Sequence, residues 1–259
     1  MKKFELEKIT KNLIETFIIS GDRAIELRNR GLITQIKSDK TPVTNADIEV
    51  DKLIKEKILS ITPNIPIISE ETVNLNHKNT NKNFWLIDPI DGTSDYINNK
   101  DEFTLNAALI FNLEPILGII YAPAKKRLFY SYGNGNAYEE SENNKIILNC
   151  KKKNKSKKII AVSNSLKPSE EIINIHKKFM VDKFINMRSS YKFCVIASGE
   201  YDLYVAKARA FEWDIAAGHA ILEHAGGFIT THEGKKILYG KESYKNLSII
   251  AKRAVNLEK

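Results

Sequence analysis

The sequence predicts a mixed fold in which an α+β first half is followed by an α/β second half. In the first half, two segments of helical period precede short apolar runs and alternating segments typical of antiparallel strands. In the second half, strands alternate with helices. The lysine run KKKNKSKK at 151–158 separates the two patterns. We therefore expect an α+β half at 1–150 and an α/β half at 151–259.

Two helices are predicted near the N-terminus. Apolar residues recur at helical intervals over 4–28, where Ser20–Gly21 allows a bend, and again over 45–59. Thr44 stands before the second segment as a candidate N-cap. A short strand at 33–37 is expected between the two helices.

Strands are expected to fill the rest of the first half. The apolar runs at 65–69 and 84–88 flank a polar loop at 72–83 and have the composition of buried strands. The segment 103–150 then alternates apolar and polar residues around a Gly133-Asn134-Gly135 turn. This alternation is typical of an antiparallel meander.

Strands and helices alternate after the lysine run. The predicted strands cover 159–162, 184–187 and 202–205, and the predicted helices cover 170–179, 191–198 and 213–225. Clefts between two halves of this kind are common ligand sites.

Composition excludes several classes of protein. The 259 residues are 42% hydrophobic, which is enough for a sizeable core in one large domain or two smaller ones. No window approaches the roughly 18 consecutive apolar residues of a membrane span, and the N-terminus does not resemble a secretory signal. Cys150 and Cys194 fit neither a metal site nor a disulfide framework, so both are expected to be packing residues and a cytoplasmic location is expected.

The net charge of +8 does not indicate a nucleic-acid partner. Much of the excess lies in the lysine run at 151–158, where aromatic residues do not alternate with the cations. We expect this run to be a solvated loop.

The stretch WLIDPIDGTSD, Trp85 to Asp95, gathers three carboxylates behind a predicted buried strand. An EF-hand is excluded, because Ile87 and Pro89 would stand where oxygen ligands belong. An aspartate-nucleophile phosphatase is disfavoured, because Asp91 lies three residues after Asp88 instead of two. A simple turn in which Asp91 caps a helix remains open.

A second interpretation of this stretch is a metal and phosphate site. Pro89 holds Asp88 in extended geometry, so Asp88 and Asp91 can converge at the end of the strand. Residues 92–94 then open a helix whose free N–H groups suit a phosphate. Hard oxygen donors without histidine or cysteine favour Mg²⁺ over zinc.

Two further acids stand at similar junctions. Glu70 ends the apolar run IPIISEE, and Asp214 opens the segment FEWDIAAGHAILEHAGG, in which residues 216–218 leave room for close approach. Each acid also has a structural interpretation, Glu70 as a solvated strand end and Asp214 as a first-turn acid favoured by the helix dipole.

The stretches ISEE, WLIDPIDGTSD and EWDIAAGHAILEHAGG, in this order and at this spacing, resemble the inositol monophosphatase family of magnesium-dependent, lithium-sensitive phosphatases. The resemblance covers almost the whole chain and implies a layered α/β/α/β/α sandwich with two or three Mg²⁺ ions. It implies that one ion is held by Glu70, Asp88 and the backbone carbonyl of Ile90. It implies that a second is held by Asp88, Asp91 and Asp214.

The stretch KSDKTPVTNADIEVD contains another candidate, Asp47. From the residues alone, Asp47 closes a capping box with Thr44. The resemblance implies that Asp47 and Thr93 together accept a proton from an attacking water, which Glu70 and Thr93 orient, and that no phosphoenzyme forms. Lys37 matches a basic residue that offsets negative charge near the site.

Within the family, DEFTLNAALI at 101–110 and SSYKFCVIASGEYDLYV at 189–205 look more like the 3′(2′),5′-bisphosphate nucleotidases of the CysQ type. That likeness implies a small phosphorylated substrate, adenosine 3′,5′-bisphosphate, from which the 3′-phosphate is removed. The segment YVAKARAFEWD departs from the CysQ-type pattern before Asp214. The likeness therefore does not decide which residues form the wall of the substrate site, or which substrate they accept. Inositol monophosphate hydrolysis and a non-catalytic phospholigand-binding protein are the alternatives. A homodimer is expected.

Substrate contacts are expected from residues that offer amides, hydroxyls or charge near the predicted metals: Gly92, Thr93, Ser94, Asp214, Ser189, Ser190 and Lys192. Ser189, Ser190 and Lys192 would bind a second phosphate at a helix start. The alternative is that Ser189 caps that helix and Lys192 is solvated. His219 and His224 are expected to be packing or surface residues, and Tyr191, Phe193 and Tyr201 core or rim residues.

Overall fold

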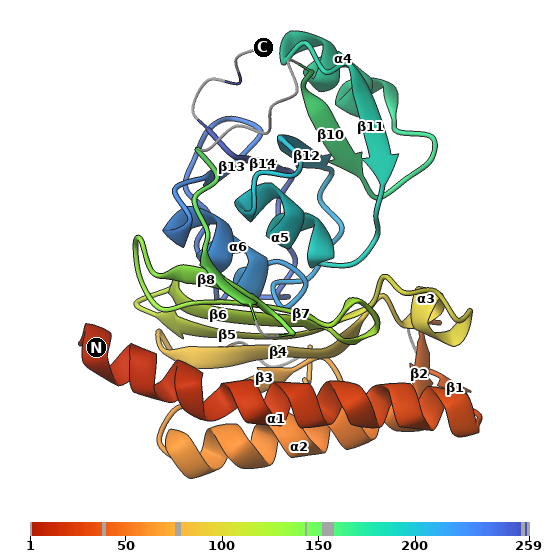
Figure 1. Cartoon of the computed structure of the whole chain (residues 1–259), viewed down its shortest axis with the longest axis vertical. Helices are drawn as coiled ribbons and strands as arrows, with labels where there is room; N and C mark the ends of the chain where they lie inside the picture. The colour runs from red at the N-terminus through yellow and green to blue at the C-terminus, as the bar shows by residue number, and fades with distance from the viewer. Residues whose placement is uncertain are drawn as a thin grey trace.

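Residues 2–37, 40–75, 79–142, 144–151, 158–254 and 257 are described by the computed structural model, and they stack as five layers of helices and sheets (Figure 1). The first layer holds α1 (Lys3–Arg30) and α2 (Asn45–Ile61), with a two-stranded ribbon of β1 (Thr34–Ile36) and β2 (Pro42–Thr44) beside them. α1 continues through Ser20–Gly21 as one helix without the expected bend, and the missing side chain of Gly21 leaves room for the ring of Tyr121. Ser20–Gly21, where a bend was expected, is therefore a site where α1 packs closely against Tyr121.

The second layer is a seven-stranded sheet in the order β3-β4-β5-β6-β7-β8-β9. Its strands are β3 (Ile67–Ser69), β4 (Phe84–Asp91), β5 (Thr104–Phe111), β6 (Glu114–Ala122), β7 (Arg127–Ser131), β8 (Ala137–Ser141) and β9 (Asn144–Ile147). β3 pairs with β4 in parallel, and the remaining pairs form the predicted antiparallel meander. The short helix α3 (Thr93–Ile97) follows β4, and a 3₁₀ turn (Pro123–Lys125) follows β6.

Both faces of this sheet are covered. Trp85 and Ile87 pack in a core shared with α1 and α2, whereas Phe84 and Leu86 pack in a core on the other side. This division follows from the two-residue period of a strand, in which successive side chains point to opposite faces. An apolar run such as FWLI is therefore the pattern of a strand buried on both faces.

The third layer holds α5 (Tyr191–Ala197) and α6 (Ala216–His224), which lie between the two sheets (Figure 1). Because sheets cover both sides, α5 is buried all round and α6 is buried along nearly its whole length. Gly118 of β6 faces Ala217 and Ala220 of α6, and Gly218 of α6 faces the ring of Phe193. The small residues therefore allow the close approach that the sequence predicts.

The fourth layer is a five-stranded sheet in the order β11-β10-β12-β14-β13, and the fifth is α4 (Glu170–Lys178) (Figure 1). β10 (Ile160–Ser163), β11 (Lys183–Asn186) and β12 (Leu203–Ala206) are parallel and match the predicted strands. Three strands were not predicted from the sequence: β2, β13 (Phe228–Thr231) and β14 (Ile249–Lys252). The layer order confirms the predicted sandwich.

The two sheets lie on either side of the lysine run in sequence, and residues 152–157 of that run lie outside the described residues. That 1–150 and 151–259 act as separate halves stays a prediction. In the part of the chain that the structure describes, no helix is long and apolar enough to cross a membrane.

Candidate active site

β4 carries a bulge at the DPID stretch. Asp88 pairs with Asn106 and Asp91 with Thr104, so one extra residue is inserted between the two aspartates. In a regular strand, side chains three apart point to opposite faces, and a one-residue bulge brings them to the same side. Asp88 and Asp91 consequently line one cavity, as predicted from Pro89.

Three of the predicted acids converge. Oxygens of Glu70, Asp88 and Asp214 lie within 4.8 Å of one another, although the residues come from the end of β3, from β4 and from the turn before α6. Burial and the neighbouring carboxylates raise the pKa of Asp88 and of Asp214 well above the ordinary value. Oδ1 of Asp88 is buried and has no hydrogen-bond partner among the described residues.

The fourth acid, Asp91, is held from the other half of the chain. Its Oδ2 accepts a hydrogen bond from the backbone N–H of Ser190, at the start of α5. The Ser190 hydroxyl lies 2.7 Å from both Asn106 Oδ1 and Thr104 Oγ1 on β5. This network fixes the side of the cavity where β5 meets α5.

Asp47 caps α2 and also lies next to Thr93. Its Oδ2 accepts hydrogen bonds from the N–H and the hydroxyl of Thr44, at 2.7 and 2.5 Å, which completes the predicted capping box. Its other oxygen lies 3.4 Å from the hydroxyl of Thr93, which also donates to the carbonyl of Ile90 at 3.0 Å. Burial raises the pKa of Asp47.

Lys37 lies beside the acidic cluster. Its ammonium donates to Glu70 at 3.1 Å and to Glu71 at 2.8 Å. The cation therefore offsets part of the charge of Glu70, although burial is the larger influence and the pKa of Glu70 is raised.

The turn after β4 presents its backbone to the cavity. Gly92 has φ of +91°, a conformation that strongly favours glycine, and a side chain there would crowd the carbonyl of Glu102. Gly92, Thr93 and Ser94 all line the cavity.

The predicted second-phosphate residues are mostly buried. Ser189 and Ser190 are 0% and 1% exposed, and Ser189 Oγ accepts from the N–H of Tyr191 at 3.3 Å. Lys192 lines the cavity, and its ammonium donates to the carbonyls of Arg188 and Ser189 at 3.1 and 2.8 Å. Burial lowers its pKa, and the charges of Asp91 and Asp214 oppose that shift.

The acids and the turn enclose a cavity of about 360 Å³. The lining residues that were not predicted from the sequence include Asn164, Arg188, Tyr204 and Arg209. Arg209 stands within the YVAKARAFEWD segment, whose departure from the CysQ-type pattern was the only signal that pointed to it.

The donor set fits Mg²⁺. Carboxylate oxygens from three elements meet at one point, and one of them, Asp88 Oδ1, lacks any other partner among the described residues. Oxygen ligands of this kind suit a hard divalent cation.

The histidines of α6 have structural partners instead. His219 Nδ1 lies 2.8 Å from the hydroxyl of Tyr239, and His224 Nδ1 accepts from the N–H of Gly133 at 3.2 Å. Both are buried, as are Tyr191 and Phe193, which confirms them as packing residues.

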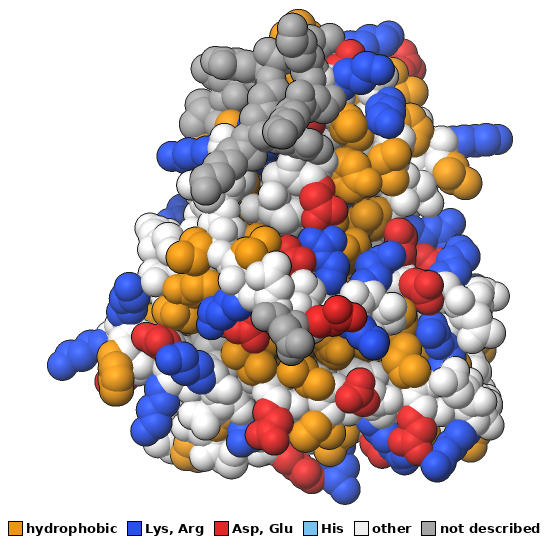
Figure 2. All heavy atoms as spheres, viewed as in Figure 1, with side chains coloured by type: hydrophobic (Ala, Val, Ile, Leu, Met, Phe, Trp, Pro, Cys, Tyr) orange, Lys and Arg blue, Asp and Glu red, His pale blue; other side chains and the backbone are white. Residues whose placement is uncertain are grey.

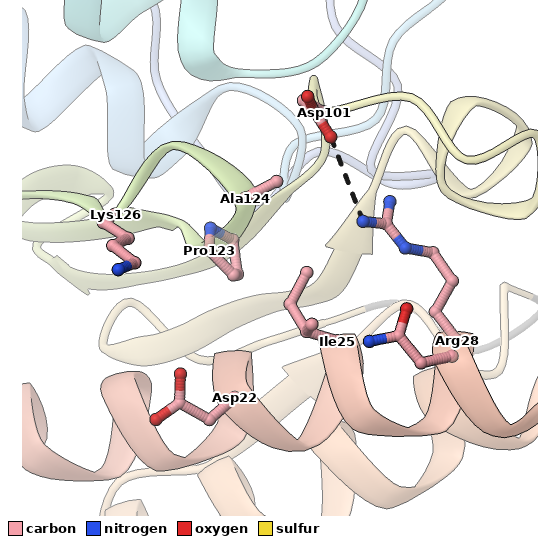
Figure 3. Close-up of a pocket in the computed structure, with 8 residues that line it drawn as sticks. Asp22, Ile25, Arg28, Asp101, Pro123, Ala124 and Lys126 are labelled. Carbon is pink, nitrogen blue, oxygen red and sulfur yellow. Dashed lines mark ion pairs between the residues drawn. The ribbon is translucent and has the colours of Figure 1, made fainter.

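A separate hollow lies between α1 and the 3₁₀ turn after β6 (Figure 3). There Arg28 pairs with Asp101 at 3.9 Å, and its guanidinium lies over the rings of Tyr96 and Phe103. Its described lining mixes Asp22 and Asp101 with Arg28 and Lys126, so it does not present the convergent acids of the first cavity.

Curated relatives resemble the chain over most of its length. A protein of Buchnera aphidicola named 3′(2′),5′-bisphosphate nucleotidase CysQ is 36% identical over 208 residues, which are 80% of this chain and 77% of the relative. A protein of the same name from Aggregatibacter actinomycetemcomitans is 30% identical over 93% of this chain and 91% of its own length.

Solved structures share the fold. CysQ from Bacteroides thetaiotaomicron, described as a bacterial member of the inositol monophosphatase family, matches with a TM-score of 0.74 and 28% identity over 93% of this chain and 96% of that one. An IMPase/NADP phosphatase complexed with Mg²⁺ and phosphate matches with a TM-score of 0.78 and 20% identity, over 96% and 91% of the two chains, a likeness of fold alone. The model of the inositol monophosphatase family matches residues 5–258, and this chain belongs to that family.

Proposed function

We propose that this protein is a Mg²⁺-dependent phosphomonoester hydrolase that removes the 3′-phosphate of adenosine 3′,5′-bisphosphate. The observation that carries the proposal is the convergence of Glu70, Asp88 and Asp214 at a cavity walled by the β4–α3 turn. The relatives named CysQ support the choice of substrate.

The acids would hold the metal ions. One ion would be held by Glu70, Asp88 and the Ile90 carbonyl. A second would be held by Asp88, Asp91 and Asp214. Whether a third ion binds can be determined by metal titration. Bound Mg²⁺ supplies Lewis-acid polarisation of the phosphoryl group and lowers the pKa of a coordinated water. It also neutralises carboxylates that otherwise repel one another.

Thr93 and Asp47 would move the proton. The Thr93 hydroxyl accepts a proton from the attacking water and passes its own proton to Asp47 Oδ1, which lies 3.4 Å away. The raised pKa of Asp47 favours its acting as the acceptor. Glu70 orients the same water, whose oxygen bonds to phosphorus in line as the bond between phosphorus and the ribose oxygen breaks. The ribose oxygen leaves with the bonding electrons and takes up a proton from solvent.

The remaining site residues would bind the reacting phosphate. Backbone amides of Gly92, Thr93 and Ser94 donate to its oxygens and stabilise charge in the transition state. Asp214 would also contact the substrate. Lys192, whose ammonium is held by two carbonyls, lowers the net negative charge of this wall. A direct role of Ser189, Ser190 and Lys192 at a second phosphate stays a prediction.

The test is phosphate release from adenosine 3′,5′-bisphosphate and from inositol 1-phosphate, with Mg²⁺ and with chelator. We expect turnover of the nucleotide that chelation abolishes. Faster turnover of inositol phosphate would favour an inositol monophosphatase, and binding without turnover would favour a phospholigand-binding protein. The homodimer and the cytoplasmic location stay predictions that sedimentation and cell fractionation can test.

A further inference from the structure

Glu212 is a buried carboxylate that the proposed reaction does not use. It stands two residues before Asp214 in the sequence, and its side chain is 0% exposed. Figure 2 shows lysine, arginine, aspartate and glutamate side chains at the surface of one face of the molecule, where water solvates them. A carboxylate that is taken out of water is costly unless its oxygens find strong partners. The partners of Glu212 therefore indicate what its burial contributes.

The partners of Glu212 come from residues 238–246, which are part of the connection between β13 and β14 and are called the clamp segment below. Oε2 of Glu212 accepts a hydrogen bond from the N–H of Gly240 at 2.8 Å, and Oε1 accepts one from the N–H of Lys241 at 3.0 Å. The ammonium of Lys241 lies 2.6 Å from the same Oε1. Both carboxylate oxygens are therefore bound by the clamp segment.

The clamp segment is itself anchored to two other layers of the fold. The N–H of Tyr239 donates to the carbonyl of Leu113, in the turn between β5 and β6, at 3.0 Å. The hydroxyl of Tyr239 lies 2.8 Å from Nδ1 of His219 on α6. Because Tyr239 is buried, water does not compete for these contacts. The clamp segment therefore has a fixed position relative to the seven-stranded sheet and to α6.

Glu212 also organises the backbone of the turn before α6. Its carbonyl accepts the N–H groups of Ile215 and Ala216 at 3.2 and 2.9 Å, so the hydrogen bonding of the helix begins at this residue. Its own N–H donates to the carbonyl of Tyr244, in the clamp segment, at 2.7 Å. The side chain and the backbone of Glu212 are thus bound by the same segment.

The clamp segment also holds the residue that orients Asp214. Oδ2 of Asp214 accepts a hydrogen bond from the N–H of Phe211 at 2.8 Å. The carbonyl of Phe211 in turn accepts one from the side-chain amide of Asn246, which is buried, at 2.7 Å. Two contacts, one through Glu212 and one through Asn246, therefore connect the clamp segment to the turn that carries Asp214.

From this geometry we infer that Glu212 and Asn246 are positioning residues that hold the carboxylate of Asp214 at the acidic cavity. The inference rests on the proposed function for the role of Asp214 as a metal ligand. Carboxylates that converge without an ion repel one another, so a ligand that is not held from behind turns away from the others. Hydrogen bonds behind the ligands keep them in place for the ion.

The experiment compares Glu212→Gln with Asp202→Asn in the full-length protein. Asp202 is the matched control, because it is also a buried carboxylate that pairs with a cation, Arg253, and accepts a backbone N–H, but it is not among the described residues that line the acidic cavity. Both variants lose a buried ion pair and should unfold at lower urea concentration than the wild type. Where all three proteins are folded, calorimetry should show Mg²⁺ binding about 10- to 100-fold weaker in Glu212→Gln and unchanged within about twofold in Asp202→Asn.

Lys241→Met separates the effect of position from that of charge. It keeps both backbone hydrogen bonds of Glu212 and removes only the ammonium. If Glu212 acted only through its negative charge, the loss of this cation would strengthen Mg²⁺ binding. The positioning role predicts Mg²⁺ binding within about threefold of the wild type in Lys241→Met, and binding that is tighter than this overturns it.

Trp213 provides a readout that requires neither metal nor turnover. Its ring stacks on that of Phe211, with centroids 4.7 Å apart, and it is 3% exposed. The other tryptophan of the chain, Trp85, is fully buried in the core shared with α1 and α2. If Glu212 holds the turn, acrylamide should quench the tryptophan fluorescence of Glu212→Gln about twofold more strongly than that of the wild type. The quenching of Asp202→Asn should equal that of the wild type.

Equal weakening of Mg²⁺ binding in Glu212→Gln and Asp202→Asn, or weakening in neither, overturns the positioning role even if the wild type hydrolyses the nucleotide. If the wild type binds no Mg²⁺, the proposed function fails and the quenching alone decides. Stronger quenching in Glu212→Gln than in Asp202→Asn then supports the hold on the turn, and equal quenching overturns it.

Asn246→Ala takes the place of Glu212→Gln if that variant does not fold. It removes the side-chain hydrogen bond to the carbonyl of Phe211 and leaves the partners of Glu212 intact. We expect Mg²⁺ binding about 3- to 10-fold weaker than in the wild type, the range of one lost hydrogen bond. Wild-type Mg²⁺ binding in Asn246→Ala overturns the role of the clamp segment.

Discussion

Asp88 is buried among four other carboxylates, and one of its oxygens has no partner in the described part of the chain. Replacing it with asparagine removes a charge that repels Glu70, Asp91 and Asp214. We expect Asp88→Asn to lower phosphate release about 100- to 1000-fold, since a metal ligand contributes several kcal/mol to the transition state. We expect its melting temperature in chelator to equal or exceed that of the wild type.

Asp101→Asn is the control for this variant, because Asp101 is an exposed acid outside the cavity. It should retain wild-type turnover and stability. Wild-type turnover in Asp88→Asn would show that Asp88 is not a ligand of the proposed metal site. A large loss of stability of this variant in chelator would show that repulsion between Asp88 and the other carboxylates does not dominate the stability of the metal-free protein.

Thr93 tests the proposed proton path. Thr93→Val keeps the shape of the side chain but removes the hydroxyl that lies 3.4 Å from Asp47. We expect kcat to fall about 10²- to 10⁴-fold, the range of general acid–base catalysis, with KM nearly unchanged. Thr93→Ser restores the hydroxyl and should recover most of kcat, and no recovery would show that the methyl group matters more than the proton.

The acidic residues of the site could be predicted from the sequence, whereas most of the residues that surround them could not. Pro89 between two aspartates already implied that both converge, and the bulge of β4 confirms it. The contact of Asp91 with the N–H of Ser190 joins residues 99 positions apart and leaves no local pattern. Arg209 was not predicted for a similar reason, because its place in the cavity wall depends on elements that are distant in sequence.

At the scale of elements, the spacing between β6 and α6 depends on Gly118. A side chain there would meet the carbonyl of Ala217 and lie 3.0 Å from the methyl group of Ala220. We expect Gly118→Ala to destabilise the fold by about 1–3 kcal/mol, the usual cost of overpacking. It should also lower kcat, because α6 begins two residues after Asp214 and would be displaced.

Ile119→Val provides the comparison from the same strand, since Ile119 packs in the core on the α1 and α2 side. It should cost about 0.5–1.5 kcal/mol and leave kcat unchanged. Denaturant unfolding and turnover, measured on both variants, distinguish a general loss of stability from a displaced helix. Unchanged kcat in Gly118→Ala would show that the turn before α6 holds Asp214 in place independently of the position of α6.

His224 ties the end of α6 to the Gly133 turn and should make stability depend on pH. Burial lowers the pKa of His224 to about 4, below its ordinary 6.5. The unfolded chain therefore binds more protons between these values, so stability is complete above pH 6.5 and is lost as the pH falls toward 4. We expect a loss of about 2–3 kcal/mol between pH 7 and 4.5.

His224→Gln should flatten this part of the pH profile in urea unfolding. Other groups titrate in the same pH range. The relevant quantity is therefore the difference in free energy of unfolding between the wild type and His224→Gln at each pH. Parallel profiles for the two proteins would show that the imidazole is accessible to protons in the folded state.

Helices and the meander were predicted because their periods are long and regular, whereas β13 and β14 were missed. Each has only four residues, and they pair with each other across a long loop, so neither shows a sustained alternation. α6 also begins at Ala216, three residues later than predicted, because Phe211 donates its N–H to Asp214 within a turn. That turn places Asp214 at the cavity. It was not predicted, because the helical sequence pattern continues through it.

For the whole molecule, the proposed metal site joins layers that are distant in sequence. Glu70 and Asp88 belong to the seven-stranded sheet region, and Asp214 belongs to the approach to α6 between the sheets. An ion bound only by the folded state stabilises it by RT ln(1 + [L]/Kd), about 2.7 kcal/mol at a concentration 100 times Kd. We therefore expect the melting temperature to rise with Mg²⁺ and to fall in chelator. Asp214→Asn removes the carboxylate that comes from between the sheets, so most of the Mg²⁺-dependent shift should disappear, whereas Asp101→Asn should keep it. A melting temperature of the wild type that is insensitive to Mg²⁺ at millimolar concentration would contradict a shared ion between these layers, whatever the activity of the protein.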